Sequence, residues 1–205
     1  NKLFLIKSRI IIGKVVDELD LTISAEPVHL PFIGATFARR HNGIEVAEPL
    51  FGFETYAWGG EDINISYLNL SERYLDKNLK LVALEDQKFA LLYNEQELLK
   101  GYVGKPVYSS DGDLEIMISS LIARPGTQFK VHKSNRLKKI LQLQSNLSVS
   151  EKGKQSNIIM IALNGGDKNS ITSIVNSVTE NYYFQSKKSL ALEAESSLIF
   201  LDQQI

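Results

Sequence analysis

Cysteine is absent from this sequence of 205 residues, which excludes disulfides, thiolate metal ligands and cysteine nucleophiles. It has no run of about 18 to 20 apolar residues, so no segment is predicted to span a bilayer, and no signal peptide is recognisable. Neither sign of charge dominates, with 23 basic and 24 acidic residues. Bulk charge therefore gives no reason to expect nucleic acid as a partner.

Catalytic and metal-binding patterns are also missing. The histidines His29, His41 and His132 lack metal-ligand spacing. No G-x-x-x-x-G-K-[ST] loop for phosphate occurs. The acidic pairs Asp111 with Asp113 and Glu61 with Asp62 are interpreted as turn residues rather than as the carboxylates of a glycosidase. The sequence therefore predicts no catalytic, cofactor-binding or metal-binding residue and no enzymatic activity of its own.

Helical periodicity marks both ends of the chain. It predicts helices over residues 2–19 and 135–145, and a long helix from residue 168 onward, about 57 Å if it continues to residue 205. The chain starts without methionine in apolar helical sequence and stops without a helix-ending signal. We therefore expect a fragment whose membrane anchors lie outside it.

The middle of the chain is predicted to be β-rich. Short alternating segments separated by turn residues favour a β-sandwich or jelly roll. Residues 147–151 and 158–163 are expected to be neighbouring strands, the second an apolar run typical of a fully buried strand. A short strand at 21–23 and a short amphipathic helix at 32–38 are also expected. The strand candidates of the middle region are 44–48, 51–57, 63–70, 78–84, 88–93, 98–103, 113–122 and 127–133.

Together these elements predict an α+β fold: a small helix-covered β base, a long C-terminal helix and a β-sandwich or jelly-roll-like insertion. The predicted division assigns residues 1–43 to the N-terminal helical part of the base, 44–133 to the insertion and 134–205 to the rest of the base.

Two groups of residues are candidates for binding. Trp58, Tyr56 and Arg124 are candidate saccharide contacts, because an aromatic ring can stack on a sugar. The alternatives are that Trp58 is a core residue and that Arg124 begins a tight Pro-Gly turn. Arg136, Lys138 and Lys139 are candidate inter-subunit contacts. They lie in a basic region, 124–154, that could face the acidic region 42–97 of a neighbour; the alternative is a solvated helix face.

Four stretches resemble a known family. They are the opening "IKSR" with "VV" and "LDL" at residues 6–21, "FIGATFAR" at 32–39, "ARPGTQF" at 123–129, and "VNSV", "NY", "Q", "KS", "EA", "SL" and "FL" within 175–204. The sequence resembles the Wzz-type chain-length determinants, also called polysaccharide co-polymerases. It is most similar to the periplasmic domain of Wzc-like bacterial tyrosine autokinases. It departs from their pattern at Phe37, where Trp is common, and at Lys187, where Arg is usual.

The resemblance implies a periplasmic assembly or regulatory domain of an inner-membrane protein that controls capsule or exopolysaccharide polymerisation, chain length and export. It implies two flanking transmembrane helices and a cytoplasmic kinase domain, and ATP and magnesium only in that domain. The resemblance implies that the longer protein forms a homo-oligomer. Its expected partners are a polysaccharide polymerase and an outer-membrane export protein, and the polysaccharide itself is a possible partner. The alternative function is a carbohydrate-binding β module that recognises the polymer.

Overall fold

A computed structural model describes residues 2–31, 34, 36, 38, 46–49, 52–153, 158–165 and 167–202. The chain divides into two compact units: residues 1–22 with 136–205, which we call the base, and residues 23–135, which we call the β-rich unit. The predicted α+β class is confirmed. The boundaries between the units fall after residues 22 and 135 of the sequence, whereas the sequence suggested boundaries after 43 and 133. The first boundary is earlier because residues 23–27 pair with a strand of the β-rich unit.

Two short helices open the base, where the sequence predicted one. They are α1 (Lys2–Ile6) and α2 (Arg9–Glu18). The break falls at Ser8, whose hydroxyl accepts a hydrogen bond from the backbone N of Ile11 at 3.4 Å. Serine at this position caps the first turn of a helix, so Ser8 begins α2 rather than continuing α1.

The base core lies between these helices and three further elements: α4 (Arg136–Asn146), the hairpin of β9 (Leu147–Glu151) and β10 (Ile159–Leu163), and α5 (Lys168–Asp202). Each buried aliphatic side chain of such a core contributes about 1.5 to 3 kcal/mol. The buried cluster consists of Ile6, Ile11, Ile12, Val15, Val16, Ile140, Leu143, Leu147 and Val178.

The strands β9 and β10 pair antiparallel, with Leu147 opposite Leu163, so their predicted adjacency is confirmed. Ile159, Ile161 and Leu163 pack against the base core. The other face is open, because Ile158 and Met160 are 59% and 52% exposed. The prediction of a fully buried strand was therefore wrong. This sheet has two strands, and the described helices cover one of its faces.

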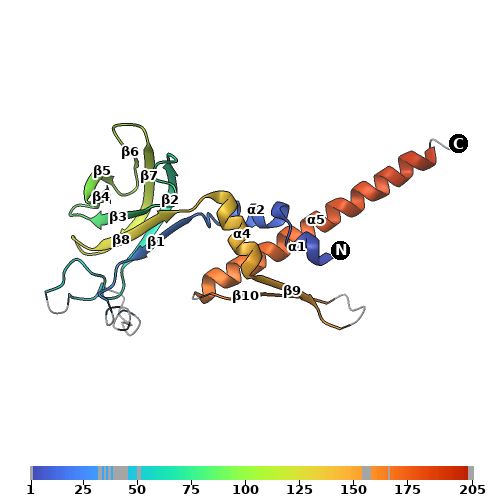
Figure 1. The fold of residues 1–205 in the computed structure, drawn as a ribbon, viewed down its shortest axis with the longest axis horizontal. Helices are drawn as coiled ribbons and strands as arrows, with labels where there is room; N and C mark the ends of the chain where they lie inside the picture. Colours follow the sequence, from blue (N-terminus) through green and yellow to red (C-terminus); the bar gives the residue numbers. More distant parts are fainter. Residues whose placement is uncertain are drawn as a thin grey trace. The chain divides into compact units, whose positions relative to one another are not determined.

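The long C-terminal helix is confirmed as α5, whose 35 residues correspond to about 52 Å. Asp167 caps it by accepting a hydrogen bond from the backbone N of Ser170 at 2.7 Å. Figure 1 shows the distal half of α5 running beyond the other elements of the base. Among the described residues, no helix is both long enough and apolar enough to cross a membrane.

The β-rich unit contains two antiparallel sheets. One has the order β1-β8-β3-β4-β5 and the other the order β2-β7-β6 (Figure 1). The pairs β1–β8, β2–β7 and β4–β5 are nested in the sequence, which is typical of a jelly roll. The strands are β1 (Ile23–Pro27), β2 (Asp62–Leu70), β3 (Asn78–Ala83), β4 (Lys88–Tyr93), β5 (Gln96–Tyr102), β6 (Pro106–Tyr108), β7 (Leu114–Ile122) and β8 (Gln128–Lys133).

Inward-facing residues of both sheets form one core, as in a β-sandwich. On β7, Leu114, Ile116 and Ile118 alternate with more exposed neighbours, as the sequence pattern predicts. The hairpin between β4 and β5 turns at Asn94 and Glu95, whose positive φ values of 50° and 63° fit a two-residue turn.

Six of the eight predicted strands are confirmed to within two residues. The prediction of a strand at 51–57 was wrong for its described part, because residues 52–56 form no strand and Ala57 makes an isolated bridge with His29. The prediction at 44–48 lies partly outside the described residues, and 46–48 form no strand. The short helix predicted at 32–38 lies mostly outside them, although positions 34, 36 and 38 are helical. Strand β6 was not predicted.

Candidate functional site

A buried carboxylate organises the loop before β2. The side chain of Glu61 is 1% exposed. Its two oxygens accept hydrogen bonds from the backbone N atoms of Trp58, at 2.9 Å, and Gly59, at 2.7 Å. Charge-assisted bonds of this kind are stronger than neutral ones, so Glu61 fixes the path of the chain through residues 58–61. We call residues 53–61 together with Arg124 the corner.

Arg124 joins the corner from the turn between β7 and β8. Its Nη2 donates to the backbone O of Tyr56 at 3.2 Å and lies 3.5 Å from Oε1 of Glu61. The turn itself is closed by a hydrogen bond from Thr127 N to Arg124 O, at 3.1 Å. Gly126 adopts a positive φ of 89° in this turn, which glycine allows without steric strain. The guanidinium of Arg124 therefore holds two segments of this unit together.

The aromatic residues of the corner differ in their exposure. Trp58 is 2% exposed, and its Nε1 donates to the backbone O of Phe53 at 3.1 Å. A ring buried to this degree has no face open to a sugar, so the predicted stacking role of Trp58 does not fit this structure. Tyr56 is half-buried and packs edge-on against the exposed Phe53. Saccharide contact through Tyr56 or Arg124 stays a prediction.

The second candidate group lies on α4. Arg136 makes two hydrogen bonds of 2.7 Å with the carboxylate of Asp17 on α2, within the same base. This pairing lowers the pKa of Asp17 and raises that of Arg136. Lys138 is exposed and Lys139 is half-buried. A subunit contact through Arg136 would have to compete with Asp17, whereas Lys138 and Lys139 stay candidates for such a contact.

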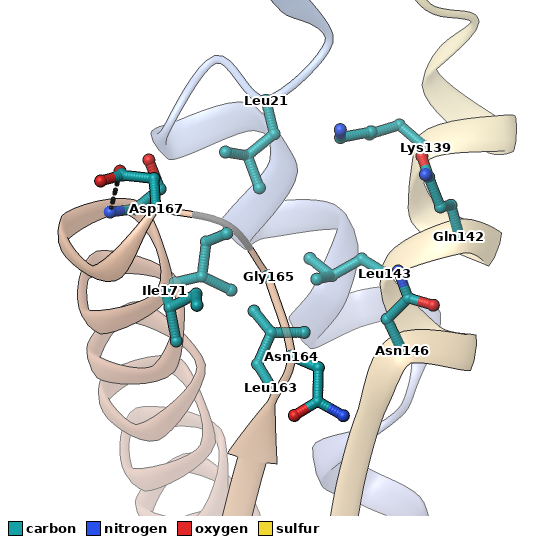
Figure 2. Close-up of a pocket in the computed structure, with 12 residues that line it drawn as sticks. Leu21, Lys139, Gln142, Leu143, Asn146, Leu163, Asn164, Gly165, Asp167 and Ile171 are labelled. Atoms are coloured by element: carbon teal, nitrogen blue, oxygen red, sulfur yellow. Dashed lines mark hydrogen bonds between the residues drawn. The ribbon is translucent and has the colours of Figure 1, made fainter. Parts of the chain in front are cut away.

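Lys139 also lines a hollow of about 180 Å³ in the base. Figure 2 shows α4 on one side of it and the start of α5 on the other, with the end of β10 between them. Leu21, Leu143 and Ile171 give it an apolar wall, and the polar groups at its rim come mainly from α4 and from the loop after β10. Such a surface can receive a small ligand or a neighbouring side chain, but it shows no arrangement of groups for catalysis.

The remaining polar candidates stabilise local structure. Oδ1 of Asp111 accepts from Ser109 Oγ at 2.5 Å and from Asp113 N at 3.1 Å, as expected for a turn aspartate, and these bonds lower its pKa. His29 and His132 each place Nδ1 within hydrogen-bonding distance of a backbone carbonyl. In the described part of the chain no group of three or more potential metal ligands comes together.

Sequence reasoning missed the roles of two acidic residues. Glu61 was interpreted as a turn residue rather than as a catalytic acid, but its binding of backbone N–H groups was not predicted, although its position after Gly59 and Gly60 hints at it. Glu18, at the end of α2, accepts hydrogen bonds from Ser177 Oγ at 3.0 Å and from Asn181 Nδ2 at 2.8 Å. Both donors belong to the closing stretch that resembles the chain-length determinants, so part of that motif ties α5 to α2.

Comparison with known proteins gives consistent results. EpsB of Ralstonia nicotianae is 37% identical over 97% of the chain. Two proteins named tyrosine-protein kinase, Wzc of Salmonella typhimurium and Etk of Escherichia coli O157:H7, are 32% and 31% identical over 98% of the chain. The chain covers 27%, 26% and 25% of these three proteins, respectively, so it spans about a quarter of their length.

A family described as "Tyrosine-protein kinase Wzc, N-terminal domain" matches residues 23–134. This match coincides to within one residue with the β-rich unit, residues 23–135. The family resemblance inferred from the sequence motifs is therefore confirmed. The chain belongs to the family of Wzc N-terminal domains of tyrosine-protein kinases.

Proposed function

We propose that this chain is the periplasmic domain of an inner-membrane tyrosine autokinase that acts in capsule or exopolysaccharide synthesis and export. The observation that carries the proposal is the family match over the whole β-rich unit. Relatives named as tyrosine-protein kinases are about four times as long as this chain, and the sequence lacks a phosphate-binding loop. Kinase activity would therefore belong to another part of the longer protein.

Within that protein the domain acts by assembly and regulation rather than by catalysis. Its base presents the long helix α5, which exposes Tyr183, Phe184, Leu190, Leu192 and Ile199 to contact with other chains. Its neighbours are further copies of the same protein, a polysaccharide polymerase and an outer-membrane export protein. Membrane anchors hold the copies in one plane, so weak lateral contacts are sufficient for a homo-oligomer.

Excision of the β-rich unit from the full-length protein tests this proposal. Residues 23–135 are replaced by a short Gly-Ser linker that joins Thr22 to Arg136, because α2 and α4 already lie together through the pair of Asp17 and Arg136. We expect tyrosine autophosphorylation to persist while the amount or chain length of the exported polymer changes. Unchanged polymer from the excised protein would refute the proposal. The exposed-site variant Glu97→Ala is the matched control, for which no change is expected.

A further inference from the structure

The outer face of the three-stranded sheet carries an unusual combination of side chains. Antiparallel register places Asn69, Glu115 and Tyr108 in one row across β2, β7 and β6. The same register places Tyr67, Met117 and Pro106 in the adjacent row. Residues that alternate with them on β2 and β7, such as Leu68 and Ile116, are buried in the core. Because side chains alternate between faces, these six residues lie on the outward face, and we call them the outer patch.

Polar contacts in the outer patch centre on Glu115. Oε2 of Glu115 accepts from Nδ2 of Asn69 at 2.9 Å. Tyr67 on β2 and Tyr108 on β6 flank Glu115, and interaction with their hydroxyl groups lowers the pKa of its carboxyl. Hydrogen bonds from Asn69 and Tyr67 lower the pKa of Glu115, which is therefore ionised at neutral pH. The hydrogen bond between Asn69 and Glu115 reduces the side-chain ordering that these two residues need on binding, which favours affinity.

The patch offers both kinds of contact that a sugar requires. Tyr108 is 64% exposed, and Tyr67 and Met117 are half-buried, so apolar surface is available beside polar groups. The C–H face of a pyranose can pack against such surface, as amphipathic aromatic side chains allow. Each tyrosine hydroxyl has lone pairs that can accept a hydrogen bond from a sugar hydroxyl.

The size of the patch favours a sugar unit over a protein partner. Three strands span about 10 Å, and two rows along a strand span about 7 Å. A stable protein interface needs about 800 Å² from each partner, which is far more than this patch supplies. A single saccharide unit matches its extent.

We propose that the outer patch binds a neutral pyranose unit of a polysaccharide. The proposal deepens the proposed function and rests on it for the presence of polymer near this domain. Glu115 determines the charge class of the ligand, because an ionised carboxylate repels uronic acids and other anionic sugars. Sugar contact is thereby assigned to Tyr108 and Tyr67, in place of the buried Trp58.

The two methionines of the chain provide a direct assay, because only Met117 belongs to the outer patch. The 205-residue chain, labelled with ¹³C at the methionine methyl groups, is titrated with neutral tetrasaccharides of glucose, galactose and mannose. We expect a saturable shift of the Met117 signal at millimolar concentrations for at least one of them, while Met160 in the base stays unchanged. Met117→Leu assigns the signals, and fluorescence of the single Trp58 should not change on binding.

Tyr108→Ala should weaken the apparent affinity by about tenfold, the loss expected for one aromatic stacking contact. Tyr102→Ala, which removes an exposed tyrosine from β5, is the matched control and should leave the affinity unchanged. A galacturonic-acid tetrasaccharide should bind more weakly than the neutral one, and Glu115→Gln should reduce that difference. Absence of a saturable Met117 shift, equal binding by Tyr108→Ala, or equal binding of the acidic sugar would overturn the proposal.

This assay is independent of the test of the proposed function. If excision of residues 23–135 alters the polymer but no neutral sugar shifts Met117, the sugar site is wrong and the proposed function stands. If Met117 shifts as expected but excision leaves the polymer unchanged, the domain binds sugar and the proposed role in polymer control is wrong.

Discussion

Replacing Glu61 by alanine should destabilise the β-rich unit more than most single substitutions do. The carboxylate is almost fully buried and has three partners: the backbone N atoms of Trp58 and Gly59 and the guanidinium of Arg124. Removing it leaves two backbone donors without their acceptor and leaves Arg124 without its carboxylate partner, although Arg124 keeps its bond to the backbone O of Tyr56. A point mutation that removes one partner of a buried ion pair leaves an unpaired charge, and such mutations cause some of the largest losses of unfolding free energy.

The expected loss of unfolding free energy is about 3 kcal/mol. Breaking a buried ion pair by removing one partner costs about 3 to 5 kcal/mol. The lower end applies here, because the Arg124 side chain is 19% exposed and its nearest oxygen of Glu61 is 3.5 Å away. Domains of this size have unfolding free energies of about 5 to 15 kcal/mol, so the variant should still fold.

Urea unfolding followed by the fluorescence of Trp58 measures this loss. Trp58 is the single tryptophan of the chain and lies in the corner, so its emission reports on the β-rich unit. The matched control is Glu97→Ala, an exposed glutamate on β5, for which we expect a change within about 0.5 kcal/mol. In the double variant Glu61→Ala with Arg124→Ala, the loss should be smaller than the sum of the two single losses.

A loss below about 1 kcal/mol for Glu61→Ala, with an unchanged dependence on urea, would refute this reasoning. It would mean that water replaces the carboxylate with little cost. Additive losses in the double variant would separately refute the coupling between Glu61 and Arg124.

Three further predictions concern the base, the sheet edge and catalysis. The pKa of Asp17 is lowered from 3.8 chiefly by the hydrogen bond from Arg136, so its pairing stabilises the base above about pH 4 and is lost as the pH falls through the lowered pKa. Asp17→Asn should therefore reduce unfolding free energy at pH 7 and remove this pH dependence, as measured by thermal unfolding at low salt. Gly101→Ala should cost about 1 to 3 kcal/mol in urea unfolding, because the new Cβ would lie 2.2 Å from a methyl group of Val107; an unchanged midpoint would contradict this. The purified chain should show no magnesium-dependent ATP hydrolysis in a phosphate-release assay, and turnover that follows the pure chain would contradict this.

Much of the secondary structure was predictable because it follows from patterns among residues that are close in the sequence. Alternation on β7 and the turn residues between strands place most of the β-rich unit, and uninterrupted helical periodicity places α5. The break between α1 and α2 was missed, because the helical spacing of apolar residues continues on both sides of Ser8. The break is caused by Ser8, whose side chain caps the start of α2. The exposure of Ile158 and Met160 could not be read from their sequence, because a continuous apolar run does not reveal how many layers cover a strand.

The predicted sites depended on interactions that are distant in the sequence. The sequence left Trp58 either as a sugar-stacking residue or as a core residue, and the structure agrees with the second, because hydrogen bonds to the backbone O of Phe53 and the carboxylate of Glu61 hold this segment in the interior. Arg124 was recognised as part of a tight turn, but its contact with Glu61, 63 residues away, has no local signal. Likewise, the basic character of α4 indicates a solvated or interacting face without revealing that Arg136 is paired with Asp17.

The outer patch shows why register is needed to find such a site. Tyr67 with Asn69, and Glu115 with Met117, are ordinary pairs of outward positions on two strands, and neither pair suggests a ligand alone. Tyr108 lies on β6, a strand of three residues that the periodicity does not reveal. Only the pairing of β6 and β2 with the two edges of β7 places both tyrosines beside one carboxylate. Because β7 carries the carboxylate that both tyrosines flank, Glu115→Gln should change the surroundings of both rings, whereas Tyr108→Ala removes only one ring.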